Sequence, residues 1–326
     1  NLTVRDGAVQ SYQALTVDSL DIQDATTSVT LDGDVTTEAT LDINTLTGKL
    51  IQNAKVDAGT SVDYDAVTIG INESIKSGTT IDIDTSGNTT TIAAAGDITA
   101  SGAVTFGANK SGTLTTSGDI DTSNDNVTFT RAVTLGGAVD IDTGSGAGNI
   151  LFSSTVATGD NNLSLDAGAS GNITADKSIT GGGAFTVRDG AVQKYSGVVT
   201  VDSLDIKDAT TSVTLDGDVT TKTTLDINSG GTLTQNAKVD VGTSVNYDAG
   251  QTIDINNTIK SGEKIDIDAT GKTTIAAAGD ITASGAVTFG ANKSGTLTTA
   301  GEITTTDDNV TFTNAVTQSG DVDIDT

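Results

Sequence analysis

The sequence predicts an all-β fold, a right-handed parallel β-helix, from three observations. An apolar-x-apolar pattern recurs at a fixed interval, a long block of the first half returns in the second half, and no helical periodicity is present. The pattern is carried by two columns, Phe106, Phe129 and Phe152, and Val104, Val127 and Ile150. A side-chain period of two inside a segment, repeated about every two dozen residues, is what stacked equivalent strands of a solenoid require.

The register of these columns extends beyond the three phenylalanines. It reaches back to Ile81 and Ile83 and forward to Ile173 and Ala175, so that five consecutive segments share one column. For a chain of 326 residues, a coil of about 23 residues predicts about 14 coils. The right hand follows from the usual chirality of connections between parallel strands.

Each predicted coil contains three strands. In the coil that begins at Asn126, the inward residues are Val127 and Phe129, Val133 and Leu135, and Val139 and Ile141. The next coil repeats the arrangement with Ile150 and Phe152, Val156, and Leu163 and Leu165. Glycines such as Gly144 and Gly168 are expected at the corners, since they tolerate left-handed backbone conformations.

A longer repeat overlies the coils. The segment Val4–Gln10 returns as Val187–Gln193, and Thr91–Thr116 returns as Thr274–Thr299, at the same offset along the chain. We therefore predict that residues 1–183 form a first long repeat of about eight coils and residues 184–326 a second, incomplete one, in one continuous solenoid. Because the chain begins inside a strand-like segment and ends within a repeat, we expect it to be a window of a longer chain.

Composition excludes several functional classes. The formal charge is −27, and Cys, His, Met, Trp and Pro are absent. Such an acidic chain lacks the basic face that nucleic acid or an anionic lipid surface requires. Without Cys there is no disulfide and no thiol catalysis. No apolar run exceeds four residues, so we expect no membrane insertion of this segment.

Acidic pairs at positions i and i+2 are the first candidates for chemistry. Paired carboxylates suggest a glycosidase, but residues at this spacing face the same outer side of a strand and form no concave site. We therefore predict that the protein is not an enzyme, and we assign no catalytic, cofactor-binding or metal-binding residue. The pairs are Asp82/Asp84, Asp119/Asp121, Asp140/Asp142, Asp266/Asp268 and Asp323/Asp325.

Stacked acids also suggest calcium, which takes six to eight oxygen ligands. Glycine-acid steps recur at intervals close to the length of one coil. They are Gly96-Asp97, Gly118-Asp119, Gly279-Asp280, Gly301-Glu302 and Gly320-Asp321. The Gly-Gly-x-Gly-x-Asp rhythm of calcium-binding rolls is absent. Solvated acids are the main interpretation, and structural Ca²⁺ is the alternative.

An ice-binding face would need a flat array of outward threonines. The outward column reads Asp82, Thr105, Thr128, Leu151, Thr174, which is mixed and one residue wide, so this function is disfavoured.

Four tyrosines fall at equivalent points of the two long repeats, as Tyr12/Tyr195 and Tyr64/Tyr247. We expect them to cap coil edges. The alternative is that they are exposed contact points for a glycan or a neighbouring filament, because Tyr combines an apolar body with a polar tip. The arginines Arg5, Arg131 and Arg188 are too few and too scattered to predict an anion site.

The segments Gly148–Val156 and Asn162–Gly168 resemble the coils of filamentous-haemagglutinin-like bacterial exoproteins and related giant repetitive surface adhesins. The resemblance implies a secreted β-helical fibre that mediates attachment, cell-cell cohesion or biofilm formation. On this basis we expect a structural segment of an extracellular fibre or adhesin stalk at the bacterial cell surface. Expected partners are other fibres of the same kind and a host or neighbouring-cell glycan or protein.

Two alternatives to the adhesin stalk remain. The first is a calcium-stabilised repeat of a secreted matrix or sheath protein, and the more remote one is a glycan-processing β-helix enzyme.

Overall fold

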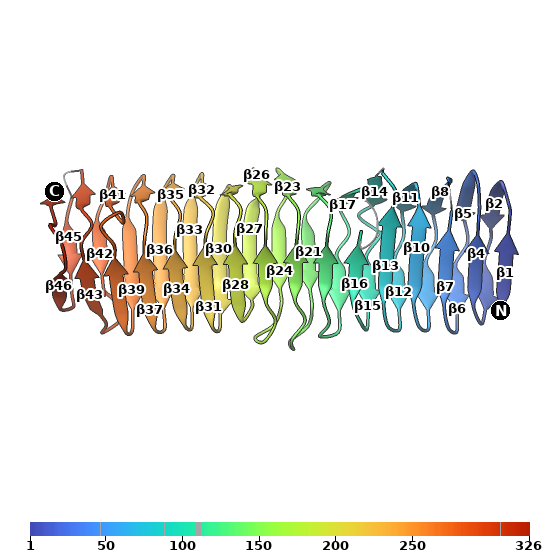
Figure 1. The fold of residues 1–326 in the computed structure, drawn as a ribbon, viewed down its shortest axis with the longest axis horizontal. Coiled ribbons are helices and arrows are strands. Elements are labelled where there is room, and N and C mark those ends of the chain that lie inside the picture. The colour runs from blue at the N-terminus through green and yellow to red at the C-terminus, as the bar shows by residue number, and fades with distance from the viewer. Residues whose placement is uncertain (46, 88, 108–111, 307) are drawn as a thin grey trace. The chain divides into compact units, whose positions relative to one another are not determined.

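All regular secondary structure in the described chain is β-strand. The computed structural model describes residues 1–45, 47–87, 89–107, 112–306 and 308–326, and these contain 47 strands. They form two compact units, Asn1–Gly171 and Asn172–Thr326, each of which is a right-handed parallel β-solenoid with three strands per coil (Figure 1). The predicted fold class is thereby confirmed. Within the described residues, no helix is long and apolar enough to cross a membrane.

The first unit contains eight coils, whose strands stack into three parallel sheets. One sheet comprises β1 (Leu2–Arg5), β4 (Leu20–Gln23), β7 (Leu41–Asn44), β10 (Val62–Ala66), β13 (Ile81–Thr85), β16 (Val104–Phe106), β19 (Val127–Phe129) and β22 (Ile150–Phe152). The second comprises β2 (Val9–Tyr12), β5 (Ser28–Leu31), β8 (Lys49–Gln52), β11 (Thr68–Ile71), β14 (Thr89–Ile92), β17 (Thr113–Thr116), β20 (Val133–Leu135) and β23 (Val156–Gly159). The third comprises β3 (Leu15–Val17), β6 (Val35–Thr37), β9 (Val56–Ala58), β12 (Ile75–Ser77), β15 (Ile98–Ala100), β18 (Ile120–Thr122), β21 (Val139–Asp142) and β24 (Leu163–Asp166).

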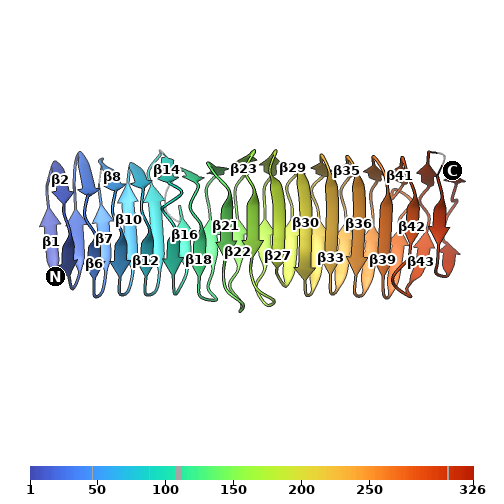
Figure 2. The same ribbon diagram turned by 180° about the vertical axis from the view of Figure 1, so that it is seen from behind.

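The second unit contains seven coils and two further strands, again in three parallel sheets (Figure 2). One sheet comprises β25 (Ile173–Ala175), β28 (Val192–Tyr195), β31 (Ser212–Leu215), β34 (Thr232–Gln235), β37 (Thr252–Ile255), β40 (Lys272–Ile275), β43 (Thr296–Thr299) and β46 (Val316–Gln318). The second comprises β26 (Ile179–Gly181), β29 (Val199–Val201), β32 (Val219–Thr221), β35 (Val239–Val241), β38 (Ile259–Ser261), β41 (Ile281–Ala283), β44 (Ile303–Thr305) and β47 (Ile324–Asp325). The third comprises β27 (Ala184–Asp189), β30 (Ser203–Ala209), β33 (Thr224–Ser229), β36 (Ser244–Ala249), β39 (Ile265–Ala269), β42 (Val287–Phe289) and β45 (Val310–Phe312).

The predicted three-strand coil is confirmed. β19, β20 and β21 follow one another around one coil, and their residues alternate between buried apolar and solvent-facing positions. The register Ile81↔Val104↔Val127↔Ile150 joins four consecutive coils of the first unit, as the apolar column predicts. Alternation works here because successive side chains of a strand point to opposite faces, so that one set fills the core.

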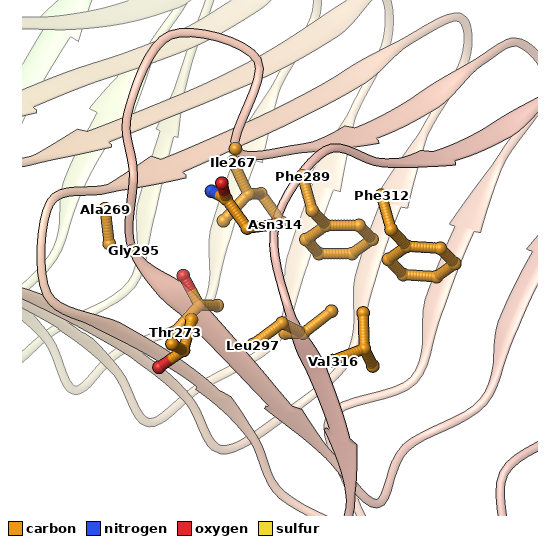
Figure 3. A pocket seen from close by; sticks show the side chains of 11 residues that line it. Ile267, Ala269, Thr273, Phe289, Gly295, Leu297, Phe312, Asn314 and Val316 are labelled. Carbon is orange, nitrogen blue, oxygen red and sulfur yellow. The ribbon is translucent and has the colours of Figure 1, made fainter.

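The phenylalanine column forms a stack of parallel rings inside the first unit. The ring centroids of Phe106 and Phe129 lie 5.1 Å apart, and those of Phe129 and Phe152 lie 4.7 Å apart. In the second unit, the rings of Phe289 and Phe312 lie 5.4 Å apart (Figure 3). The core cavity beside this second pair has a volume of only about 10 Å³, about the space that one water needs.

Coil length is more variable than the phenylalanine column predicts. Val104 pairs with Val127, whereas the partners Leu2 and Leu20 are closer together along the chain, and Lys272 and Thr296 are further apart. The mean is about 21 residues, which gives about 15 coils instead of 14. Most of the differences lie in the turns, but the pairing of β30 with β33 shifts register between Ile206 and Ala209.

The long repeat does not contain a whole number of coils. Strand β1 corresponds in sequence to β27, β16 to β42 and β19 to β45, so equivalent strands are 26 positions apart in the order of strands. With three strands per coil, 26 strands make eight coils and two strands. The long repeat therefore contains a whole number of strands but not a whole number of coils.

Close approach between coils explains several corner glycines. A Cβ atom on Gly78 would lie 1.9 Å from the carbonyl oxygen of Gly59, and one on Gly59 would lie 2.1 Å from that of Glu38. The predicted left-handed backbone conformation is confirmed at Gly144 (φ 80°) and Gly168 (φ 63°). At these corners the backbones of successive coils are in direct contact and leave no room for a side chain.

Gly78→Ala is expected to lower the free energy of unfolding by about 2–3 kcal/mol, because the methyl group overlaps backbone that cannot move without opening the ladder. Gly70→Ala is the matched control. A Cβ there has Leu50 O as its nearest neighbour, at 4.0 Å, and replacing a strand glycine by alanine is then neutral or stabilising. Thermal unfolding followed by circular dichroism measures both variants, and equal melting temperatures would contradict the steric explanation.

Candidate functional site

The most distinctive surface feature of the first unit is a row of four aspartates, here called the aspartate ladder. Asp21, Asp42, Asp63 and Asp82 each occupy the outward position between two buried apolar residues of their strand. They pair directly, Asp21 with Asp42, Asp42 with Asp63 and Asp63 with Asp82. Neighbouring strands are about 4.8 Å apart, so adjacent carboxylates repel one another.

The second unit carries the sequence-equivalent ladder, Asp205, Asp226, Asn246 and Asp266, with the same direct pairing. One position differs, because Asn246 replaces the equivalent of Asp63. The Asn246 Nδ2 donates a hydrogen bond of 2.9 Å to Asp226 Oδ1. Asn246 therefore removes two carboxylate–carboxylate contacts from the second ladder and makes an attractive contact with Asp226.

Burial and mutual repulsion raise the pKa of two members of the ladder, Asp42 and Asp82. The pKa of Asp82 is raised to about 6, first by partial burial and then by the carboxylates of Asp84 and Asp63, with Arg131 opposing the rise. The pKa of Asp42 is also raised to about 6, by burial and by Asp63 and Asp21. Since the Asp42 side chain is exposed and its interactions are screened by solvent, the larger effect on stability is expected at Asp82.

A raised pKa makes the ionised Asp82 destabilising. The contribution of Asp82 to stability is fully present below its ordinary pKa of 3.8 and is lost as the pH rises through about 6. Asp82→Asn is therefore expected to raise the free energy of unfolding at pH 7 by about 1 kcal/mol after solvent screening, and to change little at pH 4. Melting temperatures of the two proteins at both pH values test this, and a gain that is equal at both would contradict it.

The acid at the i+2 position of Asp82 is buried, contrary to our prediction of a flat solvated surface. Asp84 and Arg131 form an ion pair of 3.3 Å, from Arg131 Nη2 to Asp84 Oδ1, with side chains only 7% and 2% exposed. Arg131 Nη1 also donates to Thr85 Oγ1. The arginine reaches across two coils to cover an outward position of β13, so Arg131 binds an acid of the same chain.

The second unit covers the equivalent acid differently. Asp268 is 2% exposed, and its Oδ2 accepts hydrogen bonds from Asn292 N (3.2 Å) and Asn292 Nδ2 (2.7 Å). Asn292 lies in the loop 290–295 between β42 and β43. Next to it, Lys293 Nζ contacts Asp248 Oδ1, and Asn314, at the position equivalent to Arg131, donates from Nδ2 to Lys293 O (2.7 Å).

The glycine-acid steps have a structural role in the described residues. Asp119 N donates to Asp97 Oδ1 (3.0 Å), Asp140 N to Asp119 Oδ1 (2.8 Å), and Glu302 N to Asp280 Oδ1 (2.9 Å). Asp97, Asp119 and Asp280 thus each accept a backbone hydrogen bond from the next coil. No group of three or more acids among the described residues is arranged to hold a metal ion.

Most of the remaining paired acids lie at outward, solvent-accessible positions, as the sequence predicts. Asp121 and Asp323 are exposed, while Asp119, Asp140 and Asp142 are half-buried at outward positions. The pKa of Asp121 is raised by partial burial and then by Asp142, its partner in the ladder.

The tyrosines are core residues, and the prediction of coil-edge or exposed positions is wrong for three of the four. Tyr64, Tyr195 and Tyr247 are completely buried, and Tyr12 is half-buried. Each occupies the second inward position of its strand, where several other coils have Ile, Leu or Phe, for example Ile43, Leu31 and Phe106.

A glutamine satisfies the hydroxyl group of two of these buried tyrosines. Tyr64 OH donates to Gln52 Oε1 (3.3 Å), and Tyr195 OH donates to Gln193 Oε1 (3.1 Å). The Gln52 amide in turn donates to the carbonyl groups of Ala54 and Glu73. Tyr64 and Tyr195 therefore depend on these glutamines for the partner that a buried hydroxyl requires, whereas the hydroxyl of Tyr247 has no hydrogen-bond partner among the described residues. The three buried tyrosines are unavailable as surface contacts.

Searches against protein-family models, curated protein sequences and solved structures give no match for the chain.

Proposed function

We propose that the chain is a structural segment of an extracellular fibre or adhesin stalk at a bacterial cell surface. The observation that supports this most is the unbroken parallel pairing from β1 to β24, in which eight coils are joined by the same three ladders. Such an arrangement adds length by adding coils, and each coil contacts chiefly its neighbours. A spacer benefits from interchangeable units of this kind.

The stack provides stiffness through its backbone. Hydrogen bonds between strands of successive coils run in the direction in which the coils stack, so a load in that direction is shared by three ladders. The buried phenylalanine and tyrosine side chains hold the three sheets of each unit together. This supports a mechanical role in attachment, cell-cell cohesion or biofilm formation, with other fibres or a glycan or protein of a neighbouring cell as partners.

Replacement of the segment in the natural chain tests the spacer role. Deletion of residues 1–326 is expected to reduce attachment of bacteria that display the protein, because the binding end is brought closer to the cell surface. An unrelated β-solenoid of equal length is expected to restore attachment. Failure of the replacement to restore it would mean that the surface of this segment itself is recognised, and labelling of intact cells with an antibody checks the surface location.

A second candidate, a calcium-stabilised repeat of a matrix or sheath protein, is favoured by the aspartate ladder. Carboxylates that repel one another at neutral pH are stabilised by a divalent cation. A melting temperature that rises by many degrees with CaCl₂ and falls again with EGTA supports this candidate. A change no larger than that given by NaCl of equal ionic strength is general screening and argues against it.

A further inference from the structure

The loop 290–295 of the second unit brings an amine onto a carboxylate that is held by the fold. We propose that Lys293 and Asp248 form an intramolecular amide cross-link, an isopeptide bond between Lys293 Nζ and Asp248 Cγ. This inference does not depend on the proposed function. It concerns a covalent bond within one chain and needs no partner or cofactor.

The two reacting groups are in contact and partly shielded. Lys293 Nζ contacts Asp248 Oδ1, and the two side chains are 22% and 31% exposed. Asp248 lies at an outward position of β36, while Lys293 lies in the loop that follows β42, 45 residues later. A pair held in this way reacts as an intramolecular pair of high effective concentration.

The loop is fixed on both sides of the lysine. Asn292 donates from its backbone and side-chain nitrogens to Asp268 Oδ2, and Lys293 O accepts a hydrogen bond of 2.7 Å from Asn314 Nδ2. These contacts restrict the lysine backbone, so that its side chain is directed to β36. The entropy of bringing the amine to the carboxylate is therefore lost when the chain folds, and it does not add to the barrier of the reaction.

A buried acid lies next to the pair. Asp268 pairs directly with Asp248 on the adjacent strand β39, so their backbones are about 4.8 Å apart. Its Oδ2 is engaged by Asn292, whereas its Oδ1 is buried and has no hydrogen-bond partner among the described residues. This oxygen is available to move a proton between the lysine and the aspartate.

The condensation balances without any other reagent. A proton passes from the Lys293 ammonium to the Asp248 carboxylate through Asp268, and the neutral amine then attacks Cγ of Asp248. The Cγ–N bond forms, and Asp268 takes a proton from the attacking nitrogen and gives it to one Cγ oxygen. That Cγ–O bond then breaks and the oxygen leaves as water. The net change is one ammonium and one carboxylate converted to one amide and one water.

The first long repeat offers a comparison within the same chain. Asp65 and Asp84 are the equivalents of Asp248 and Asp268, and Lys110, the equivalent of Lys293, lies outside the described residues. Asp84 faces the guanidinium of Arg131, whereas Asn314 stands at the equivalent position of the second unit. In the first repeat the acid is held in an ion pair and the lysine lies outside the described residues, so the inference is confined to the second unit.

The intact mass of the purified full chain, measured after denaturation, tests the proposal. The expected result is a mass lower than that of the sequence by one water, with a branched peptide joining the segments of residues 248 and 293 after proteolysis. Lys293→Arg keeps the positive charge and the ion pair but is expected to have the full mass of its sequence. Lys110→Arg is the matched control and is expected to retain the loss of water.

Two results would overturn the cross-link. One is a wild-type chain with the full mass of its sequence. The other is a loss of water that persists in Lys293→Arg, which would place it elsewhere, for example at a succinimide of an Asp-Gly step such as Asp189-Gly190. Asp268→Asn, checked for folding by circular dichroism, is expected to leave the chain uncross-linked, and full cross-linking in that variant would refute the role of Asp268.

Discussion

Phe129→Asp is expected to lower the free energy of unfolding of the first unit by at least about 5 kcal/mol. The variant removes the middle ring of the stack formed with Phe106 and Phe152, which lie 5.1 Å and 4.7 Å away. It also places a carboxylate in a core position that is 1% exposed. Losing the ring alone costs about 3–5 kcal/mol, and the buried charge adds to that.

Thr128→Asp is the matched control for this variant. Thr128 is the neighbouring residue on β19 but faces outward between Thr105 and Leu151, so its replacement is expected to change stability by no more than about 0.5 kcal/mol. Hydrogen exchange followed by mass spectrometry measures the effect coil by coil. Phe129→Asp should increase exchange in β16, β19 and β22 first, and similar exchange in the two variants would mean that the phenylalanine column is not the core.

Arg131→Met is expected to destabilise the first unit by about 3–5 kcal/mol, which is the typical cost of removing one member of a buried ion pair. The methionine fills part of the space of the arginine but leaves the carboxylate of Asp84, only 7% exposed, without the cation that it faces. Guanidinium unfolding measures the loss. The double variant Asp84→Leu with Arg131→Met is expected to recover most of it, because an apolar pair needs no compensation.

An exposed ion pair of the second unit provides the control. Lys194 Nζ lies 3.4 Å from Asp216 Oδ2, but the lysine side chain is 51% exposed. Lys194→Met is therefore expected to cost less than about 1 kcal/mol. A loss at Arg131 as small as that at Lys194 would show that burial does not strengthen the dependence of Asp84 on its partner.

Residues with a regular sequence pattern could be predicted, since the pattern itself is the cause of the structure. The alternation in Val127-Thr128-Phe129 determines which side chains enter the core, and the recurrence of Phe106, Phe129 and Phe152 determines which strands pair. The mean coil length could not be obtained from that column alone, because the turns between strands differ in length and their sequences contain no apolar marker.

The residues that prediction missed depend on contacts between distant coils. Asp84 has the same sequence environment as solvated aspartates, but the side chain of Arg131, 47 residues later, lies against it and helps to bury it. That separation is about two coils, which is the one signal in the sequence that indicates the pair. The tyrosines were misplaced because their polar tip suggested the surface, whereas Gln52 and Gln193 provide hydrogen-bond partners inside the core.

The 26-strand period has a consequence for how such a chain changes in length. Strand β4 pairs with β1 and β7, and its sequence equivalent β30 pairs with β27 and β33, the equivalents of β1 and β7. Equivalent strands thus have equivalent neighbours, although the period is not a whole number of coils. The same sequence can therefore form a strand in either of two of the three sheets. Duplication or loss of gene segments by unequal recombination then preserves the fold without having to cut at complete coils. The chain can lengthen or shorten by units that end at any corner.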